Sequence, residues 1–215
     1  MRRYLSVLLL AALCLTLAAC AVRVGTPIGA ENTEPPASDS VAEDLDGGAD
    51  EPLRLDALNV EFAAAGHEED ALLALQRDFP AALTEALRAR AVEAGSVRVT
   101  FGTSGEAMET ALRSGAVQLA FLPAEDYFPY RAGMIVAHED LPEEELSVSA
   151  GLVIAAPSDD AETDERLTEA LRAALDGLAP ALASYTAGSA EGRYVFDAER
   201  LETIRRLYEE SESAP

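Results

Sequence analysis

Hydrophobic residues recur with two different spacings along residues 58–183, and the two spacings alternate along the chain. Short apolar runs and strict alternation are typical of β-strands, whereas apolar residues three or four apart are typical of helices that bury one face. The expected strands are residues 58–65, 97–101, 117–122, 133–137 and 151–155, and the expected helices are residues 71–91, 106–113 and 164–183. This alternation predicts a three-layer α/β domain with a mostly parallel central sheet.

Pro80 lies inside the first expected helix, with helically spaced apolar residues on both sides of it. A proline there has no N–H to donate, and its ring collides with the preceding turn. We therefore expect this helix to kink or to split in two near Asp78. Ser104 stands just before the second expected helix and is a suitable N-cap, because its hydroxyl can accept a hydrogen bond from the first turn.

Three loops follow the carboxyl ends of expected strands and should therefore lie at one edge of the sheet. They are residues 65–69, 102–105 and 123–127. Ligands of α/β sheets bind beyond this edge, and two of the loops lead into helices whose first N–H groups can bind an anion or a carbonyl group. A simpler alternative stays open, in which Ser104 merely caps its helix and Gly105 merely eases the turn.

The chain opens with an apolar run that ends in a cysteine. Arg2 and Arg3 precede the run, residues 5–17 are almost wholly apolar, and the sequence LAAC ends it at Cys20. These features are typical of a secretory signal peptide, and the run is short for a membrane span. The LAAC sequence resembles the lipobox of bacterial lipoproteins. That resemblance implies that residues 1–19 are removed and that a lipid on the Cys20 sulfur anchors the chain to a bilayer.

Residues 20–56 are rich in proline, glycine and acidic residues and contain little that could form a core. Mutual repulsion of the acidic residues extends such a segment, so we expect a tether that holds the folded part away from the lipid surface. Residues 57–215 then form a single domain, long enough to bury its own core. Because Cys14 lies in the removed segment, the mature chain has no second cysteine for a disulfide or a cysteine-based metal site.

The formal net charge is −23, and the chain contains no lysine. A surface of this charge repels nucleic acid and anionic lipid headgroups, so we expect no nucleic-acid partner. It also disfavours a strongly anionic ligand, although local donors can outweigh the global charge.

No residue pattern points to catalysis or to a metal ion. The mature chain would have no free thiol, and neither a G-x-S-x-G motif nor a recognisable acid–base arrangement of histidines occurs. His67 and His138 each stand beside carboxylates and could share a divalent ion. Their separation in sequence has no diagnostic value, however, so we expect neither an enzyme, nor a metal site, nor a cofactor.

Residues 97–128, VRVTFGTSGEAMETALRSGAVQLAFLPAEDYF, are similar to the phosphate/phosphonate-type solute-binding proteins of ABC transporters. The likeness lies in the order of a strand, a short helix ending in ALRSG, a strand of the V-x-L-A-F-L kind, and a proline with a tyrosine soon after it. Residues 58–70 resemble the opening strand and loop of this family. Residues 194–208 resemble its closing helix, which begins at an aspartate. The resemblance implies the type 2 periplasmic-binding fold, and a lipobox suits it because many members are lipoproteins.

The resemblance also suggests which loop residues bind a ligand. Thr103, Ser104 and Tyr127 stand where members of this family place ligand-facing polar groups. Together with two glycines of the same loops, the candidate ligand-binding residues are Gly66, Thr103, Ser104, Gly105 and Tyr127. Glu125 and Asp126 stand where a phosphonate would need donors, so these carboxylates favour a cation or a neutral polar ligand.

The chain lacks the second lobe that members of this family insert between two crossings of the chain. A short acidic segment, residues 138–149, takes its place. We therefore interpret the domain as one lobe of a type 2 periplasmic binding protein whose second lobe is deleted. One lobe offers an open half-site, because a two-lobed binder grips its ligand by closing over it.

These features together predict a membrane-anchored, extracytoplasmic solute-binding lipoprotein of the cell envelope. It would bind a small polar ligand, and its partner would be the permease of an ABC-type uptake system. The alternative is a protein-interaction or sensory module of the envelope, built on a degenerate lobe that has no transport ligand.

Overall fold

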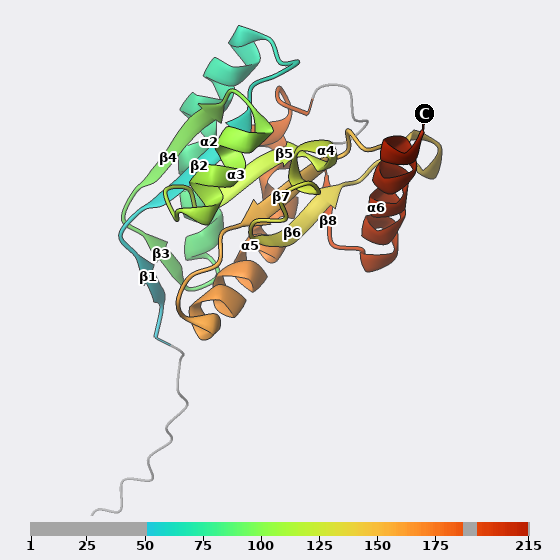
Figure 1. Ribbon diagram of the computed structural model, residues 1–215. Helices are drawn as coiled ribbons and strands as arrows, with labels where there is room; N and C mark the ends of the chain where they lie inside the picture. Colours follow the sequence, from blue (N-terminus) through green and yellow to red (C-terminus); the bar gives the residue numbers. More distant parts are fainter. Residues whose placement is uncertain (1–50, 187–192, 215) are drawn as a thin grey trace, which may run out of the picture. The chain divides into compact units, whose positions relative to one another are not determined.

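The central feature of the fold is a six-stranded sheet between two layers of helices (Figure 1). The computed structural model describes residues 51–186 and 193–214. The strand order is β4-β2-β5-β7-β6-β8. The strands are β2 (Leu58–Ala63), β4 (Val97–Gly102), β5 (Leu119–Pro123), β6 (Met134–Glu139), β7 (Gly151–Ala155) and β8 (Tyr194–Val195). The predicted three-layer α/β class is confirmed.

The sheet is mixed, whereas the sequence predicted a mostly parallel one. β2 pairs in parallel with β4 and β5, but β7 pairs antiparallel with β5 and β6, and β8 pairs antiparallel with β6. Four strands, β2, β4, β5 and β6, thus run in one direction. The physical reason is the short connection between β6 and β7, residues 140–150, because a parallel crossover needs a dozen or more residues.

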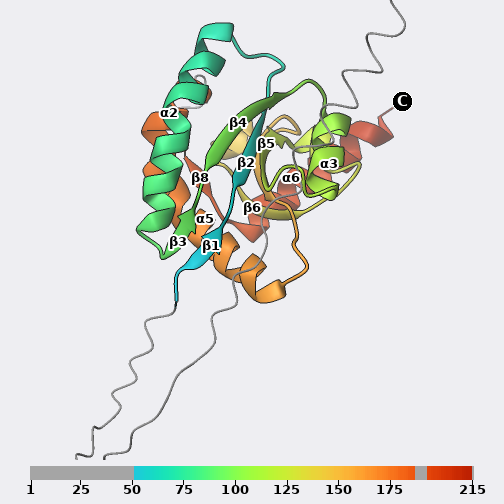
Figure 2. The same ribbon diagram turned by 90° about the vertical axis from the view of Figure 1, so that its left-hand side faces the viewer.

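Among the described residues, two helices cover one face of the sheet and three helices cover the other (Figures 1 and 2). Their buried residues belong to two separate hydrophobic clusters, one on each face. The first layer consists of α2 (Glu69–Arg88) and α5 (Ala161–Leu182). The second layer consists of α3 (Gly105–Arg113), α4 (Ala124–Tyr127) and α6 (Ala198–Ser213). The aspartate predicted to begin the closing helix does so, since Asp197 accepts hydrogen bonds from Glu199 N and Arg200 N.

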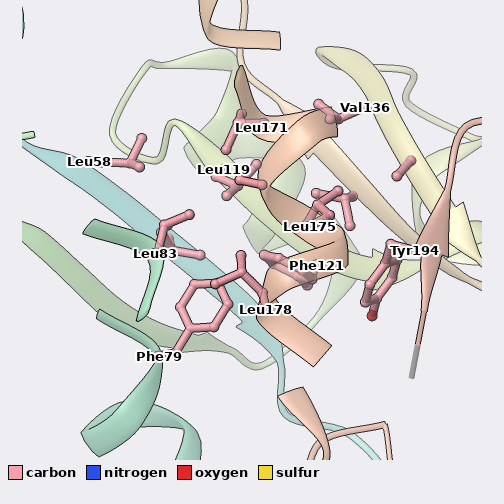
Figure 3. Packing of buried hydrophobic residues seen from close by; sticks show 14 of the residues in the cluster. Leu58, Phe79, Leu83, Leu119, Phe121, Val136, Leu171, Leu175, Leu178 and Tyr194 are labelled. Atoms are coloured by element: carbon pink, nitrogen blue, oxygen red, sulfur yellow. The ribbon is translucent and has the colours of Figure 1, made fainter. Parts of the chain in front are cut away.

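Aromatic rings form the centre of the core beneath α2 and α5. Phe62 of β2 stacks on Phe121 of β5 with 4.2 Å between ring centroids, and Phe79 of α2 meets Phe62 edge-on at 5.0 Å. Figure 3 shows Phe79 and Phe121 among the leucines of α5 and the sheet. Phe62 and Phe79 are completely buried. Because large apolar side chains dominate this interface, it contributes much of the stability of the fold.

Of the two outcomes expected for Pro80, a kink or a split near Asp78, the split is wrong. α2 continues from Glu69 to Arg88 as one helix with Pro80 inside it. An internal proline costs about 3 kcal/mol, whereas each fully buried large apolar side chain contributes about 1.5–3 kcal/mol. Four such side chains hold both halves of the helix against the sheet: Leu75, Phe79, Leu83 and Leu87.

Three strands of the described residues were missed in the sequence, because two or three residues are too few to show a period. One is β8, which lies at residues that the resemblance assigned to the closing helix. β1 (Leu53–Leu55) and β3 (Val92–Ala94) pair in parallel as a separate two-stranded sheet. β1 falls within residues 20–56, the expected tether, so the folded part begins earlier than expected and includes Leu53–Leu55. Nearby, Arg166 of α5 donates a hydrogen bond to Glu51 O at 2.7 Å. The expected signal peptide, Cys20 and the expected tether up to residue 50 lie outside the described residues.

The segment 123–127, expected to be a loop, contains the short helix α4. Its first N–H groups are taken up by the segment that leads into β7, since Ala124 N donates to Ala150 O and Glu125 N donates to Val148 O.

In residues 51–186 and 193–214, no helix is long and apolar enough to cross a membrane.

We predict that Phe79→Ala lowers the free energy of unfolding by about 3–5 kcal/mol, because it leaves a cavity against Phe62 and Phe121. The matched control is Leu73→Ala on the same helix, where the side chain is 54% exposed and the change should stay within about 0.5 kcal/mol. Urea denaturation of both variants checks this. Equal losses in the two variants would contradict the described packing of α2.

Candidate functional site

The three loops selected from the sequence lie at one edge of the sheet. β2, β4 and β5 run in the same direction, with Ala63 opposite Gly102 and Phe62 opposite Phe121, so the three strands end side by side. β6 ends at this edge too, and the antiparallel strands β7 and β8 begin there. We call this end of the sheet, with its loops, the carboxyl edge. It is where ligands of α/β sheets bind.

Ser104 and Gly105 have structural roles at the start of α3. The Ser104 hydroxyl accepts a hydrogen bond from Ala107 N at 3.3 Å, so the predicted N-cap is confirmed. A Cβ on Gly105 would lie 2.5 Å from Asp126 Oδ1, which explains why this position has no side chain. Thr103 is exposed at the same turn. The structure places these three residues at one turn, and their ligand-binding roles stay predictions.

The other two candidate residues differ in position. Gly66 is exposed after β2, with a φ of 82° that favours glycine, and a Cβ there would meet nothing within 4 Å. Tyr127 is buried, and its hydroxyl donates to Gly133 O at 3.1 Å. Gly133 precedes β6 and so lies toward the opposite end of the sheet. The structure therefore brings Gly66, Thr103 and Ser104 to one edge, while the Tyr127 hydroxyl is already bonded within the fold.

Two partly buried carboxyl groups flank the turn between β4 and α3. Glu61 lies beside Gly102, whose Cβ would be 3.4 Å from Glu61 Cδ, and Asp126 lies against Gly105. The Glu61 Oε2 atom is buried and has no hydrogen-bond partner among the described residues. Burial raises the pKa of both carboxyl groups, because it disfavours the charged form. The spacing of the sequence gave no reason to select Glu61.

The loops of the carboxyl edge are acidic. Residues 64–70, 102–106 and 123–127 contain no arginine, and their carboxylates are Glu68, Glu69, Asp70, Glu106, Glu125 and Asp126. Like charges repel an anionic ligand, and the free N–H groups of a single short helix offer it little compensation. The edge is therefore better suited to a cation or to a neutral polar group.

The two histidines lie in different surroundings and do not meet. His67, in the loop after β2, stacks on Tyr185 with 4.0 Å between ring centroids. His138 is buried, and its ring nitrogens lie 3.0 Å from Glu139 O and 3.3 Å from Asp197 O. Within the described part of the chain, no three His, Cys, Asp or Glu side chains are grouped so as to hold a metal ion.

A further group of side chains converges at the carboxyl edge from the other strands. Tyr185, which follows α5, donates its hydroxyl to Ala63 O at 3.1 Å, and Glu139 ends β6 directly opposite Tyr194 of β8. Burial lowers the pKa of His67, and the nearby Glu139 carboxylate opposes this shift. Burial and Glu139 together raise the pKa of Tyr194 well above its ordinary value. The sequence could not predict this group, because it depends on the register of β6, β7 and β8.

A hollow of about 750 Å³ lies between the segment after β6 and the start of α6. An ion pair between Arg200 Nη1 and Asp140 Oδ1, 2.5 Å long, joins its two walls. The remaining lining residues are Leu141, Pro142, Glu143, Leu146, Asp197, Glu199 and Thr203.

No known sequence family and no curated protein matches the chain. Solved structures do match. XAC2383 from Xanthomonas citri, bound to ATP, is similar with a TM-score of 0.51 and 8% identity, over 74% of this chain and 98% of that chain. PhnD1 from Prochlorococcus marinus (MIT 9301), in complex with methylphosphonate, is similar with a TM-score of 0.50 and 8% identity, over 74% of this chain and 99% of that chain. The chain has a periplasmic-binding-protein fold.

This periplasmic-binding-protein fold confirms the coarser part of the resemblance seen in residues 97–128. The narrower statements, a phosphate/phosphonate-type family and the deletion of a lobe, stay predictions. A second structure of XAC2383, bound to a chloride ion, gives the same TM-score of 0.51.

We predict that Glu61→Gln stabilises the fold at pH 7 and that this advantage shrinks as the pH falls. In the folded state, burial raises the pKa of Glu61 above its ordinary value of 4.5. The folded state therefore binds this proton more tightly than the unfolded state does, so the unmodified protein loses stability as the pH rises through the raised pKa. Glutamine does not titrate and lacks this loss. Thermal unfolding between pH 4.5 and pH 7.5 checks it, with the exposed Glu85→Gln as the control. A constant difference between Glu61→Gln and the unmodified protein would refute the assignment.

Proposed function

We propose that this chain is a solute-binding protein that takes a small polar ligand at the carboxyl edge. The observation that carries this proposal is the meeting of the loops after β2, β4 and β5 at one edge of a periplasmic-binding-protein fold. Gly66, Thr103 and Ser104 stand in these loops with their backbone or side chains exposed. The solved neighbours were captured with small ligands, methylphosphonate and ATP, which supports a role of the same general kind.

The chain would bind its ligand from one side. The described residues 140–150, between β6 and β7, contain a single turn of 3-10 helix, η1 (Glu143–Glu145), and this supports the interpretation of a one-lobed binding protein. A half-site encloses less of a ligand than a closed cleft, so its affinity should be lower unless a partner supplies the other wall.

The proposed setting is the cell envelope, outside the cytoplasm. Cleavage before Cys20 and lipidation of its sulfur would anchor the chain to a bilayer, and residues 20–50 would give it reach. The role would be delivery of ligand to the permease of an ABC-type uptake system, in which the chain itself performs no catalysis. The sequence from Arg2 to Cys20 supports this setting.

The second candidate function is an interaction or sensory module of the envelope. The hollow between residues 140–146 and α6 favours it, because the walls carry apolar side chains, Leu141 and Leu146, beside the Asp140–Arg200 ion pair. Such a module would keep the fold and would show no response to small solutes.

We predict that a specific small ligand raises the melting temperature of the purified chain and that Thr103→Ala weakens this response. Binding to the folded state alone stabilises it by mass action. The screen covers phosphate, phosphite, alkylphosphonates, amino acids, sugars, amines and divalent cations. Thr103 is exposed and Thr110 lies farther along α3, so Thr110→Ala is the control, and both variants should keep their stability within about 1 kcal/mol. A flat screen on the folded chain would argue for the interaction module.

We predict that Cys20→Ser abolishes fatty-acid incorporation when the chain is expressed in a bacterium, and that the chain then keeps residues 1–19. The serine hydroxyl cannot form the thioether that carries the lipid. Cys14→Ser is the matched control, because Cys14 lies in the segment that would be removed. Metabolic labelling with palmitate and the mass of the purified chain check this. A Cys20→Ser chain that stays labelled would show that the lipobox interpretation is mistaken.

A further inference from the structure

Three adjacent strands present one row of residues at the carboxyl edge. On one side of β6, Glu139 lies opposite Tyr194 of β8. On the other side of β6, His138 lies opposite Leu152 of β7, so the antiparallel register places Gly151 next to Glu139. A Cβ on Gly151 would lie 3.2 Å from Glu139 Oε2 and 3.5 Å from the Tyr194 hydroxyl. A carboxylate oxygen and a phenol hydroxyl therefore both approach the side of Gly151 that a side chain would cover.

Neither polar group is used to hold the fold together. Tyr194 is 4% exposed, its ring packs against Phe121 with 5.6 Å between centroids, and its hydroxyl bonds no described residue. In Figure 3, this hydroxyl lies at the end of the ring that points away from Leu119 and Leu171. The Glu139 carboxylate likewise forms no hydrogen bond or ion pair within residues 51–186 and 193–214. Both groups are therefore free to bond a ligand that reaches them, and a charged ligand group would gain most from the carboxylate.

The neighbouring rings add an apolar wall without adding positive charge. His67 lies flat against Tyr185, and the Glu139 charge influences both residues. Because burial lowers the pKa of His67, its ring is mainly neutral at pH 7 and offers a π-face. Tyr185 is fixed in place by its hydrogen bond to Ala63 O. Arg193 stands next to Tyr194 in the sequence but forms no ion pair with any described carboxylate.

We propose that Glu139 and Tyr194 form a subsite for the ammonium or guanidinium group of a small organic cation. The carboxylate would supply the opposite charge and the phenol oxygen a second acceptor, while the His67–Tyr185 stack would border the aliphatic part of the ligand. The proposal rests on the proposed solute-binding function and names its class of ligand. It differs from the chemistry of methylphosphonate, which an unpaired carboxylate would repel.

The test is calorimetric titration of the purified full-length chain with putrescine, with its uncharged analogue 1,4-butanediol, and with methylphosphonate. We expect putrescine to bind and the other two compounds not to bind. Glu139→Gln should weaken putrescine binding by about tenfold or more, since it removes a charge-assisted hydrogen bond. Gly151→Ala should weaken it as well, because the new methyl group occupies the space between the two oxygens.

Two further variants separate a specific subsite from general attraction and from damage to the fold. Glu143→Gln makes the same change of charge on exposed η1 and should leave putrescine affinity unchanged. Tyr194→Phe removes an oxygen that bonds no described residue, so it should weaken binding severalfold while thermal stability stays equal or rises.

Each other outcome overturns a defined part of the proposal. If Glu139→Gln and Glu143→Gln lower putrescine affinity equally, the binding depends only on the net charge of the protein. This result would overturn the proposed subsite. Binding of methylphosphonate alone, lost in Thr103→Ala, would overturn the cationic subsite and leave the proposed solute-binding function standing. No heat from any of the three compounds, together with a flat thermal screen of the folded chain, would overturn both.

Discussion

The stack of Phe62 on Phe121 joins the neighbouring strands β2 and β5, and most of the structure depends on it. Phe79 of α2 and Tyr185, just after α5, both meet the Phe62 ring edge-on at 5.0 Å, so both helices of one layer are fixed against the same side chain. From this centre the aromatic contacts continue to the carboxyl edge, through Tyr185 to His67 and through Phe121 to Tyr194. The core and the candidate site are therefore physically continuous, and the site residues inherit their positions from the packing of the core.

The second constraint is the short return from β6 to β7. It forces β7 to run antiparallel between β5 and β6, and so brings the start of one strand to the ends of its neighbours. Gly151 stands beside Glu139 for this reason. The loops after β2, β4 and β5 at this edge carry many carboxylates and no arginine. A ligand proposed for this edge would therefore be selected mainly by its charge.

The sequence predicted those parts of the fold that local patterns determine. The longer strands, the helices α3 and α5 and the Ser104 cap follow from periodicity and capping chemistry, and the position of three loops at one edge follows from the alternation of strands and helices. Other features depend on contacts between distant segments. α2 continues through Pro80 because the sheet holds both its halves, and the Tyr127 hydroxyl bonds Gly133 O instead of facing the loops. The proximity of Glu139 and Tyr194 requires the register of three strands, which no local pattern contains.

The hydrogen bond from Arg166 to Glu51 O has a consequence for orientation. It ties the point where the described chain begins to α5, close to β1, and β1 leads into the amino end of β2. The chain thus enters the domain at the end of the sheet opposite the carboxyl edge. The loops of the carboxyl edge therefore stand at the pole of the domain away from the residues through which the described chain enters it, so these residues do not cover the candidate site.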